Sequence, residues 1–173
     1  MSRLLEILYP LPDSSADLRQ AFRELQLPAD RPVLVHASLS AFGWVEGGAE
    51  AVVSALLESW AGVLAPAFTY KTMVTPECGP PGNGLTYGSE AVRNRLAEFF
   101  HPQMPVDRLI GAIPEALRRQ AGARRSEHPI LSFTGVGVES FLAAQSLAEP
   151  LGVIARLADA QGWVLLLGVD HTV

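Results

Sequence analysis

The 173-residue chain contains one cysteine, Cys78, and one lysine, Lys71. A single cysteine excludes an intrachain disulfide and a cysteine-based metal cluster, and it fits a reduced compartment. The sequence has no apolar run long enough to cross a membrane, and its first residues lack the basic segment and apolar core of a signal peptide. We therefore expect a soluble, cytoplasmic protein without a membrane partner.

Positive charge is scarce and comes almost entirely from arginine. The formal net charge is −5 and the isoelectric point is near 5.3, so we expect no nucleic-acid partner, because phosphate backbones require a dense basic face. The arginines nevertheless cluster at Arg118-Arg119 and Arg124-Arg125. Such clusters suit bidentate contacts with phosphate or carboxylate, and they suit the solvated end of a helix equally well. Both interpretations stay open.

The pattern of apolar residues predicts an α/β fold in one domain over residues 1–173. Hydrophobic residues make up 49% of the chain and charged residues 18%, which is typical of a folded domain. Strands are expected at 33–36, 62–66, 130–137 and 163–169, and helices at 14–26, 48–60, 89–99, 107–119, 138–145 and 151–160. The last strand has the most continuous apolar run, which predicts a central parallel strand buried on both faces. Residues 69–89, rich in proline and glycine, are expected to form a long irregular loop.

The first predicted strand leads into small and hydroxyl-bearing residues, His36-Ala37-Ser38-Leu39-Ser40, and then to Gly43. Backbone N–H groups and small side chains at the carboxyl end of a strand can face an anionic ligand. The glycine spacing matches neither the ATP nor the dinucleotide motif. A ligand cradle, a serine–histidine nucleophilic pair and a plain strand-to-helix turn all remain compatible with this segment.

Two later segments carry side chains that can take part in chemistry. Arg125-Ser126-Glu127-His128-Pro129 precedes a strand and offers a guanidinium, a hydroxyl and an imidazole, although a solvated connector would look the same. Asp170-His171 follows the last strand and could act as an orienting carboxylate and a base, or could be inert. No set of residues has metal-ligand spacing, so no metal is expected.

Four ordered stretches, residues 36–49, 64–69, 110–118 with 125–129, and 165–171, resemble the aminoglycoside 3-N-acetyltransferase family. The resemblance implies a three-layer α/β/α sandwich with a mostly parallel sheet, the last part of the family fold being absent. It implies transfer of an acetyl group from acetyl-CoA to an amino group of an aminoglycoside or a similar polyamine-like small molecule. This is antibiotic-resistance chemistry, with a histidine as general base.

The resemblance also implies roles for individual positions. Asp170 and His171 are the candidates for catalysis, since the family's downstream histidine and glutamate would follow the end of this chain. The implied cofactor-binding residues are His36, Ala37, Ser38, Leu39, Ser40, Gly43, Thr69, Arg125, Ser126 and His128. A truncated, non-catalytic CoA-binding relative and, third, a serine-dependent acyl hydrolase are the alternatives. The edge left by the absent part is a place where copies of the chain could associate.

Overall fold

The computed structural model describes residues 4–6, 14–82, 86–88 and 91–169. They build a six-stranded sheet in the order β1-β6-β2-β3-β5-β4. The strands are β1 (Leu4–Glu6), β2 (Val33–Ala37), β3 (Val63–Pro66), β4 (Arg124–Arg125), β5 (Phe133–Val136) and β6 (Trp163–Leu167). β1, β6, β2 and β3 run parallel, and β5 pairs antiparallel with β3 and with β4. The expected mostly parallel sheet is confirmed.

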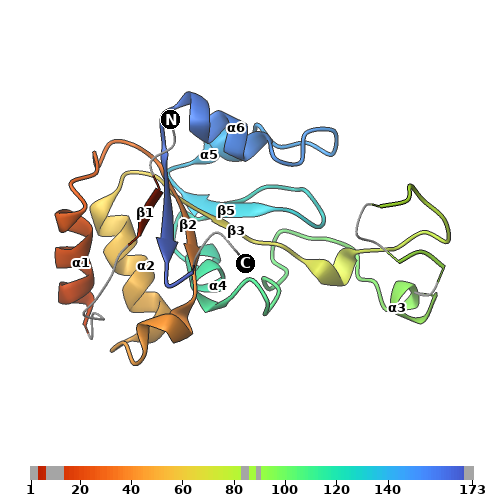
Figure 1. Ribbon diagram of the computed structural model, residues 1–173, viewed down its shortest axis with the longest axis horizontal. Helices are drawn as coiled ribbons and strands as arrows, with labels where there is room; N and C mark the ends of the chain where they lie inside the picture. The colour runs from red at the N-terminus through yellow and green to blue at the C-terminus, as the bar shows by residue number, and fades with distance from the viewer. Residues whose placement is uncertain (1–3, 7–13, 83–85, 89–90, 170–173) are drawn as a thin grey trace.

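Helices cover both faces of this sheet (Figure 1). One layer holds α1 (Ser15–Glu24), α2 (Gly48–Ser59) and α4 (Ala112–Arg118), and the other holds α5 (Glu139–Leu142) and α6 (Gly152–Asp159). Successive strand residues point to opposite faces, so Val33 and Val35 pack into the core with α1 and α2 while Leu34 packs into the core with α5 and α6. The three-layer α/β/α sandwich is therefore confirmed.

Local sequence signals explain where the first helices form. The Ser14 side chain caps α1 by accepting a hydrogen bond from the Asp17 backbone N–H at 3.3 Å. Leu18 and Phe22, four residues apart, form the buried face of α1, and the Phe22 ring lies 5.3 Å from that of Trp60 at the end of α2. None of the helices in the described part of the chain has the length and apolar character that a membrane crossing requires.

The last strand departs from its prediction in one respect. β6 is central as expected, since it pairs with both β1 and β2. It is buried on one face only: Leu165 and Leu167 are buried in the core with α1 and α2, whereas Val164 and Leu166 on the opposite face are partly exposed. The prediction of burial on both faces was wrong because α5 and α6 leave the carboxyl half of this face uncovered (Figure 1).

The helix predicted over 107–119 begins later, at Ala112. Pro114 lies in the first turn of α4, where a backbone N–H has no acceptor within the helix, so the proline does not kink it. Residues 107–111 instead form a turn that ends at Gly111, whose φ of 106° is a conformation that other residues rarely adopt. This turn becomes one wall of the cleft described below.

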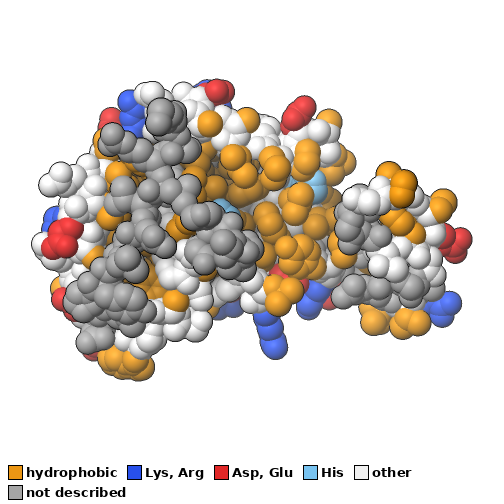
Figure 2. Space-filling view, in the orientation of Figure 1, with side chains coloured by type: hydrophobic (Ala, Val, Ile, Leu, Met, Phe, Trp, Pro, Cys, Tyr) orange, Lys and Arg blue, Asp and Glu red, His pale blue; other side chains and the backbone are white. Residues whose placement is uncertain are grey.

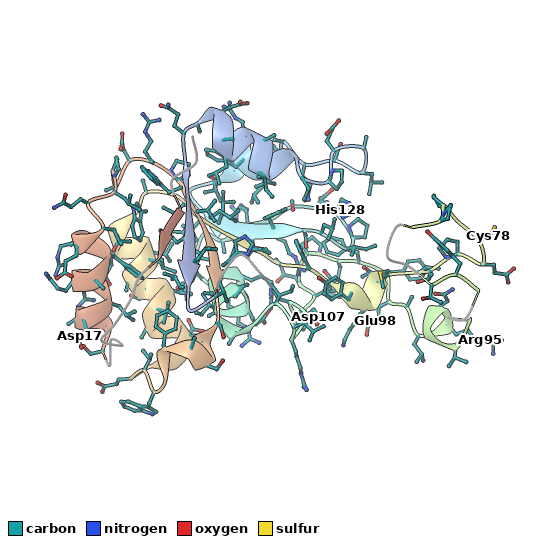
Figure 3. All side chains as sticks on the ribbon, in the orientation of Figure 1. Asp17, Cys78, Arg95, Glu98, Asp107 and His128 are labelled. Atoms are coloured by element: carbon teal, nitrogen blue, oxygen red, sulfur yellow. The ribbon has the colours of Figure 1, made fainter. Side chains whose placement is uncertain are left out.

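Residues 73–99, which we call the arm, extend away from the sheet (Figure 1). The predicted irregular loop is confirmed over its described residues, but the helix expected at 89–99 is reduced to α3 (Ala91–Arg95). The Asn94 side chain braces the arm by accepting from the Thr75 N–H at 2.9 Å and donating to the Thr75 carbonyl at 2.6 Å. Cys78 is exposed near the far end (Figure 3).

Glu115 fastens the 102–111 segment to α4. Its carboxylate accepts hydrogen bonds from the Val106 backbone N–H at 2.9 Å, from Arg118 Nη2 at 2.7 Å and from Arg119 Nε at 2.8 Å. Partial burial alone would raise the pKa of Glu115, but the hydrogen bonds from Arg118 and Val106 outweigh it and lower the pKa to about 2. The cleft wall therefore depends on an ionised carboxylate.

We expect Glu115→Gln to lower the free energy of unfolding at pH 7 by about 2 kcal/mol, because Arg118 loses its charged acceptor. The folded-state pKa lies below the unfolded value, so this stabilisation is complete above pH 4.5 and is lost as the pH falls toward about 2. Urea unfolding of both proteins at several pH values measures this: the difference between them should shrink on acidification. Glu46→Gln, at an exposed position, is the control. A difference that stays constant with pH would contradict the assignment.

Candidate functional site

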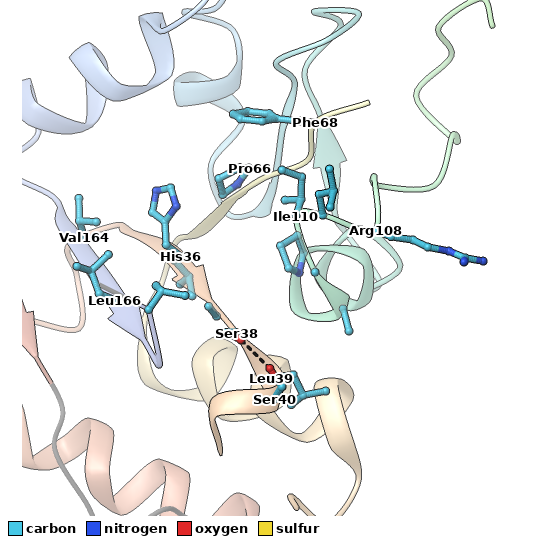
Figure 4. Close-up of a pocket in the computed structure, with 17 residues that line it drawn as sticks. His36, Ser38, Leu39, Ser40, Pro66, Phe68, Arg108, Ile110, Val164 and Leu166 are labelled. Atoms are coloured by element: carbon cyan, nitrogen blue, oxygen red, sulfur yellow. Dashed lines mark hydrogen bonds between the residues drawn. The ribbon is translucent and has the colours of Figure 1, made fainter. Parts of the chain in front are cut away.

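A cleft of about 780 Å³ opens at the carboxyl ends of β2, β3 and β6. The turn that follows β2 forms one side, and the turn before α4 forms the other (Figure 4). In open parallel sheets this end is where ligands bind, because loops from neighbouring strands meet there. The lining residues are Val35, His36, Ala37, Ser38, Leu39, Ser40, Pro66, Phe68, Arg108, Leu109, Ile110, Gly111, Ala112, Pro114, Val164, Leu166 and Val169.

The floor of the cleft is apolar. Val164 and Leu166 of β6 contribute their partly exposed faces, and Pro66 and Phe68 contribute the end of β3 and the residues beyond it. Figure 2 shows hydrophobic side chains gathered across the middle of this face of the molecule. An apolar floor favours a ligand with a flexible, largely uncharged arm, since burying such an arm is driven by the hydrophobic effect.

His36 projects from β2 into the cleft between the floor and the far wall (Figure 4). Burial lowers the pKa of the His36 imidazole below its ordinary value, so the ring is neutral at pH 7. Within the described part of the chain, no side chain or backbone group forms a hydrogen bond with this ring. A neutral imidazole without a protein partner can donate to or accept from a ligand.

The hydroxyls after β2 bond to each other. Ser38 Oγ lies 3.0 Å from Ser40 Oγ, and neither serine contacts His36 (Figure 4). The structure therefore shows no serine–histidine pair, and the hydrolase alternative loses its geometric basis. The Ser38 N–H donates to the Leu167 carbonyl at 2.9 Å, which joins this turn to the end of β6.

Gly168 allows the turn to approach β6 so closely. Its φ is +68°, and a Cβ at this position would lie 2.3 Å from the Ala41 Cβ and 3.3 Å from the Ser38 carbonyl oxygen. No side chain fits there without moving the turn. The position of Ser38 and Ser40 over the cleft thus depends on a glycine in the next strand of the sheet.

The predicted cofactor-binding residues divide into two groups. His36, Ala37, Ser38, Leu39 and Ser40 line the cleft. Five others do not: they are Gly43, Thr69, Arg125, Ser126 and His128. Gly43 ends the short 3-10 helix Leu39–Phe42 with φ of +71°. Cofactor contact by the first group stays a prediction, and the second group has other partners within the protein.

Arg125 uses all of its N–H groups on the protein itself. Its Nε donates to Ser132 Oγ at 3.0 Å, Nη1 donates to the Pro102 and Met104 carbonyls, and Nη2 donates to the Ala67 carbonyl and to Thr69 Oγ1. The guanidinium carbon also lies 5.3 Å from the centre of the Phe100 ring. Burial lowers the pKa of Arg125 to about 10, with a smaller contribution from Arg118. Arg125 is a positioning residue that ties the returning arm to β3.

Ser126 and His128 shape the approach to β5. The buried Ser126 Oγ accepts from the Phe133 N–H at 2.8 Å and contacts the Gln145 side chain. His128 Nδ1 accepts from the N–H groups of Ile130 and Leu131 at 3.2 and 3.0 Å, which closes the turn before the strand (Figure 3). These partners account for the resemblance at 125–129 through local structure rather than through ligand contact.

The predicted catalytic residues, Asp170 and His171, lie outside the described residues. Val169, which directly precedes them, lines the cleft. Among the described residues, no group of three or more His, Cys, Asp and Glu side chains could hold a metal ion.

Sequence reasoning missed the far wall of the cleft, above all Arg108. Residues 107–111 were expected to be helical, which would have given Arg108 a place on a helix surface. Two signals could have corrected this: Gly111 directly before the helix, and Pro114, which is favoured in a first turn.

Comparison with known proteins places the chain in a family. The family model for aminoglycoside 3-N-acetyltransferase matches residues 34–173. The aminoglycoside N(3')-acetyltransferase-like protein YokD of Bacillus subtilis is 30% identical and covers 92% of this chain. The crystal structure of aminoglycoside acetyltransferase AAC(3)-IIb covers 93% of the chain with 26% identity and a TM-score of 0.78. AAC-IIIb in its binary complex with CoASH covers 91% with 26% identity and a TM-score of 0.70.

The chain is shorter than these relatives. It spans 61% of the B. subtilis protein and 60% of each of the two solved chains. Within that span, the family model covers both turns that line the cleft and the strands that carry them. The chain belongs to the aminoglycoside 3-N-acetyltransferase family.

Proposed function

We propose that the chain binds acetyl-CoA in this cleft and acetylates an amino group of an aminoglycoside or a similar polyamine-like small molecule in the cytoplasm. One observation carries the proposal: the segments that resemble the family meet at a single cleft at the carboxyl ends of β2, β3 and β6. The family relative AAC-IIIb, solved with CoASH, supports CoA as the ligand.

The lining of the cleft fits the chemistry of this ligand. The pantetheine arm of CoA is long, flexible and uncharged, and the apolar floor around Phe68 and Leu166 suits it. The amides of that arm need hydrogen-bonding groups, which the Ser38 and Ser40 hydroxyls and the His36 imidazole supply. No described residue with a negative charge lines the cleft to repel the CoA phosphates.

Acetyl-CoA supplies an acetyl thioester, and its conversion to an amide releases the CoA thiol and requires a base for the amine proton. We propose the pair Asp170 and His171 for this role, since they directly follow Val169 in the cleft. A carboxylate beside an imidazole can fix the ring and stabilise the imidazolium that forms. His36, neutral at pH 7, remains free to position the thioester.

The test is a pair of measurements on the same purified chain. Calorimetric titration with CoA should show binding, and a thiol-release assay with acetyl-CoA should respond to added aminoglycoside. Spermidine serves as a polyamine that is not an aminoglycoside. We expect His171→Ala to remove aminoglycoside-dependent thiol release and to leave CoA binding unchanged. If the chain does not bind CoA, the proposal fails.

A second candidate is a CoA-binding chain that transfers no acetyl group. One observation favours it: the described residues that line the cleft include no aspartate or glutamate. An aminoglycoside carries several positive charges, which need carboxylates for recognition. CoA binding without thiol release would select this candidate. Association of copies of the chain stays a prediction, which size-exclusion chromatography tests.

A further inference from the structure

We propose that Arg108 reads the phosphate groups of the ligand and makes the cleft select CoA over phosphate-free pantetheine. This inference rests on the proposed binding of CoA. It adds a residue that determines ligand selectivity at the mouth of the cleft, on the wall that faces the Ser38 turn.

Arg108 is the one permanently charged side chain among the described residues that line the cleft. It is exposed, and within the described chain it has no ion-pair partner and donates no hydrogen bond. Nearby arginines are already engaged: Arg118 and Arg119 bond to Glu115, and Arg125 bonds only to groups of the protein. Arg108 therefore keeps its full hydrogen-bonding capacity for a ligand.

The backbone around Arg108 is fixed while its side chain is free. The Asp107 N–H donates to the Phe68 carbonyl at 2.9 Å, and the Asp107 carbonyl accepts from the Ile110 N–H at 3.0 Å. The adjacent Asp107 carboxylate accepts from the Leu109 N–H at 3.0 Å. These bonds hold the turn against the end of β3, so Arg108 begins at a defined place on the rim.

The direction of the side chain fits the polarity of CoA. Arg108 extends outward from the rim, away from His36 and the apolar floor (Figure 4). A CoA whose thioester lies near His36 must leave its phosphates toward the mouth, since the apolar floor cannot solvate them. A guanidinium there can form two parallel hydrogen bonds to one phosphate, which a lysine ammonium cannot copy.

The test compares three ligands on Arg108→Ala and on Arg124→Ala, an exposed arginine outside the cleft. Against CoA, Arg108→Ala should bind about tenfold more weakly than the wild type, the size expected for a charge-assisted pair at a surface. Against pantetheine, the two should bind alike. Arg108→Lys should recover part of the loss, and 0.5 M KCl should shrink the difference because exposed charges are screened. Dephospho-CoA shows which phosphate is read, since only a 3′-phosphate contact would be lost with it.

Equal CoA affinity of Arg108→Ala and the wild type would overturn the inference and leave the proposed function standing. A parallel loss for CoA and pantetheine would also overturn it, because Arg108 would then shape the cleft rather than read phosphate. A wild-type chain that binds no CoA overturns both. Thermal unfolding of each variant confirms that it is folded, and Arg124→Ala should match the wild type in every arm.

Discussion

Arg125→Ala should lower the free energy of unfolding by about 3 kcal/mol, the cost typical of breaking a buried polar network. The guanidinium joins β3, through the Ala67 carbonyl, to the returning arm, through the Met104 carbonyl. Alanine leaves these acceptors without a donor in the interior. Urea unfolding followed by circular dichroism measures the loss, and limited proteolysis between residues 98 and 106 should accelerate in parallel.

Two further variants make this result specific. Lysine at position 125 has three donors on one nitrogen and no planar fork, so Arg125→Lys should recover less than half of the loss. Arg124→Ala, at the exposed neighbour in the same strand, should change stability by less than about 0.5 kcal/mol. If Arg125→Ala were as stable as Arg124→Ala, the positioning role would be wrong and a role in ligand contact would return.

Gly168→Ala should disturb the cleft more than any substitution of a lining side chain. The new Cβ must find room where the Ala41 Cβ lies 2.3 Å away, and the residue must keep a φ of +68°. Together the strain and the overlap should cost about 3 kcal/mol of folding free energy. The turn that carries Ser38 and Ser40 must also shift, so CoA should bind more than about tenfold more weakly.

Gly122 offers a matched control for Gly168. Its φ is +80°, and a Cβ there would meet nothing within 4 Å. Gly122→Ala therefore introduces the same kind of backbone strain without an overlap, outside the cleft. The difference between the two variants isolates the overlap with Ala41. Equal losses of stability together with unchanged CoA binding would show that the turn does not depend on Gly168.

The sequence predicted most of the layers of this fold because periodicity reports burial. Strands around Val33 and Val63 and the helix with Leu18 and Phe22 were found within a few residues of their ends. The short edge strands β1 and β4 were not predicted, since three and two residues carry no period. The one-sided burial of β6 could not be predicted either, because an apolar run does not show which helix covers it.

The candidate site was predicted where it is continuous in sequence and missed where it depends on packing. Residues 36–40 follow a strand, and their place at the cleft follows from the rule for parallel sheets. The opposite wall comes from a turn 70 residues later, which only the folded chain brings near. Arg125 looked like a ligand-binding residue because a guanidinium suits phosphate, and only the structure shows its donors already in use.

The exposed thiol at the far end of the arm gives the chain a spectroscopic handle without any mutation. Cys78 is the one cysteine, so a maleimide fluorophore or a nitroxide spin label attaches at a single place. A label there reports the rotational freedom of the arm, and a second thiol introduced on α1 would turn it into a distance ruler between arm and sheet. The brace formed by Asn94 and the Arg125 joint then become measurable as changes in that distance distribution.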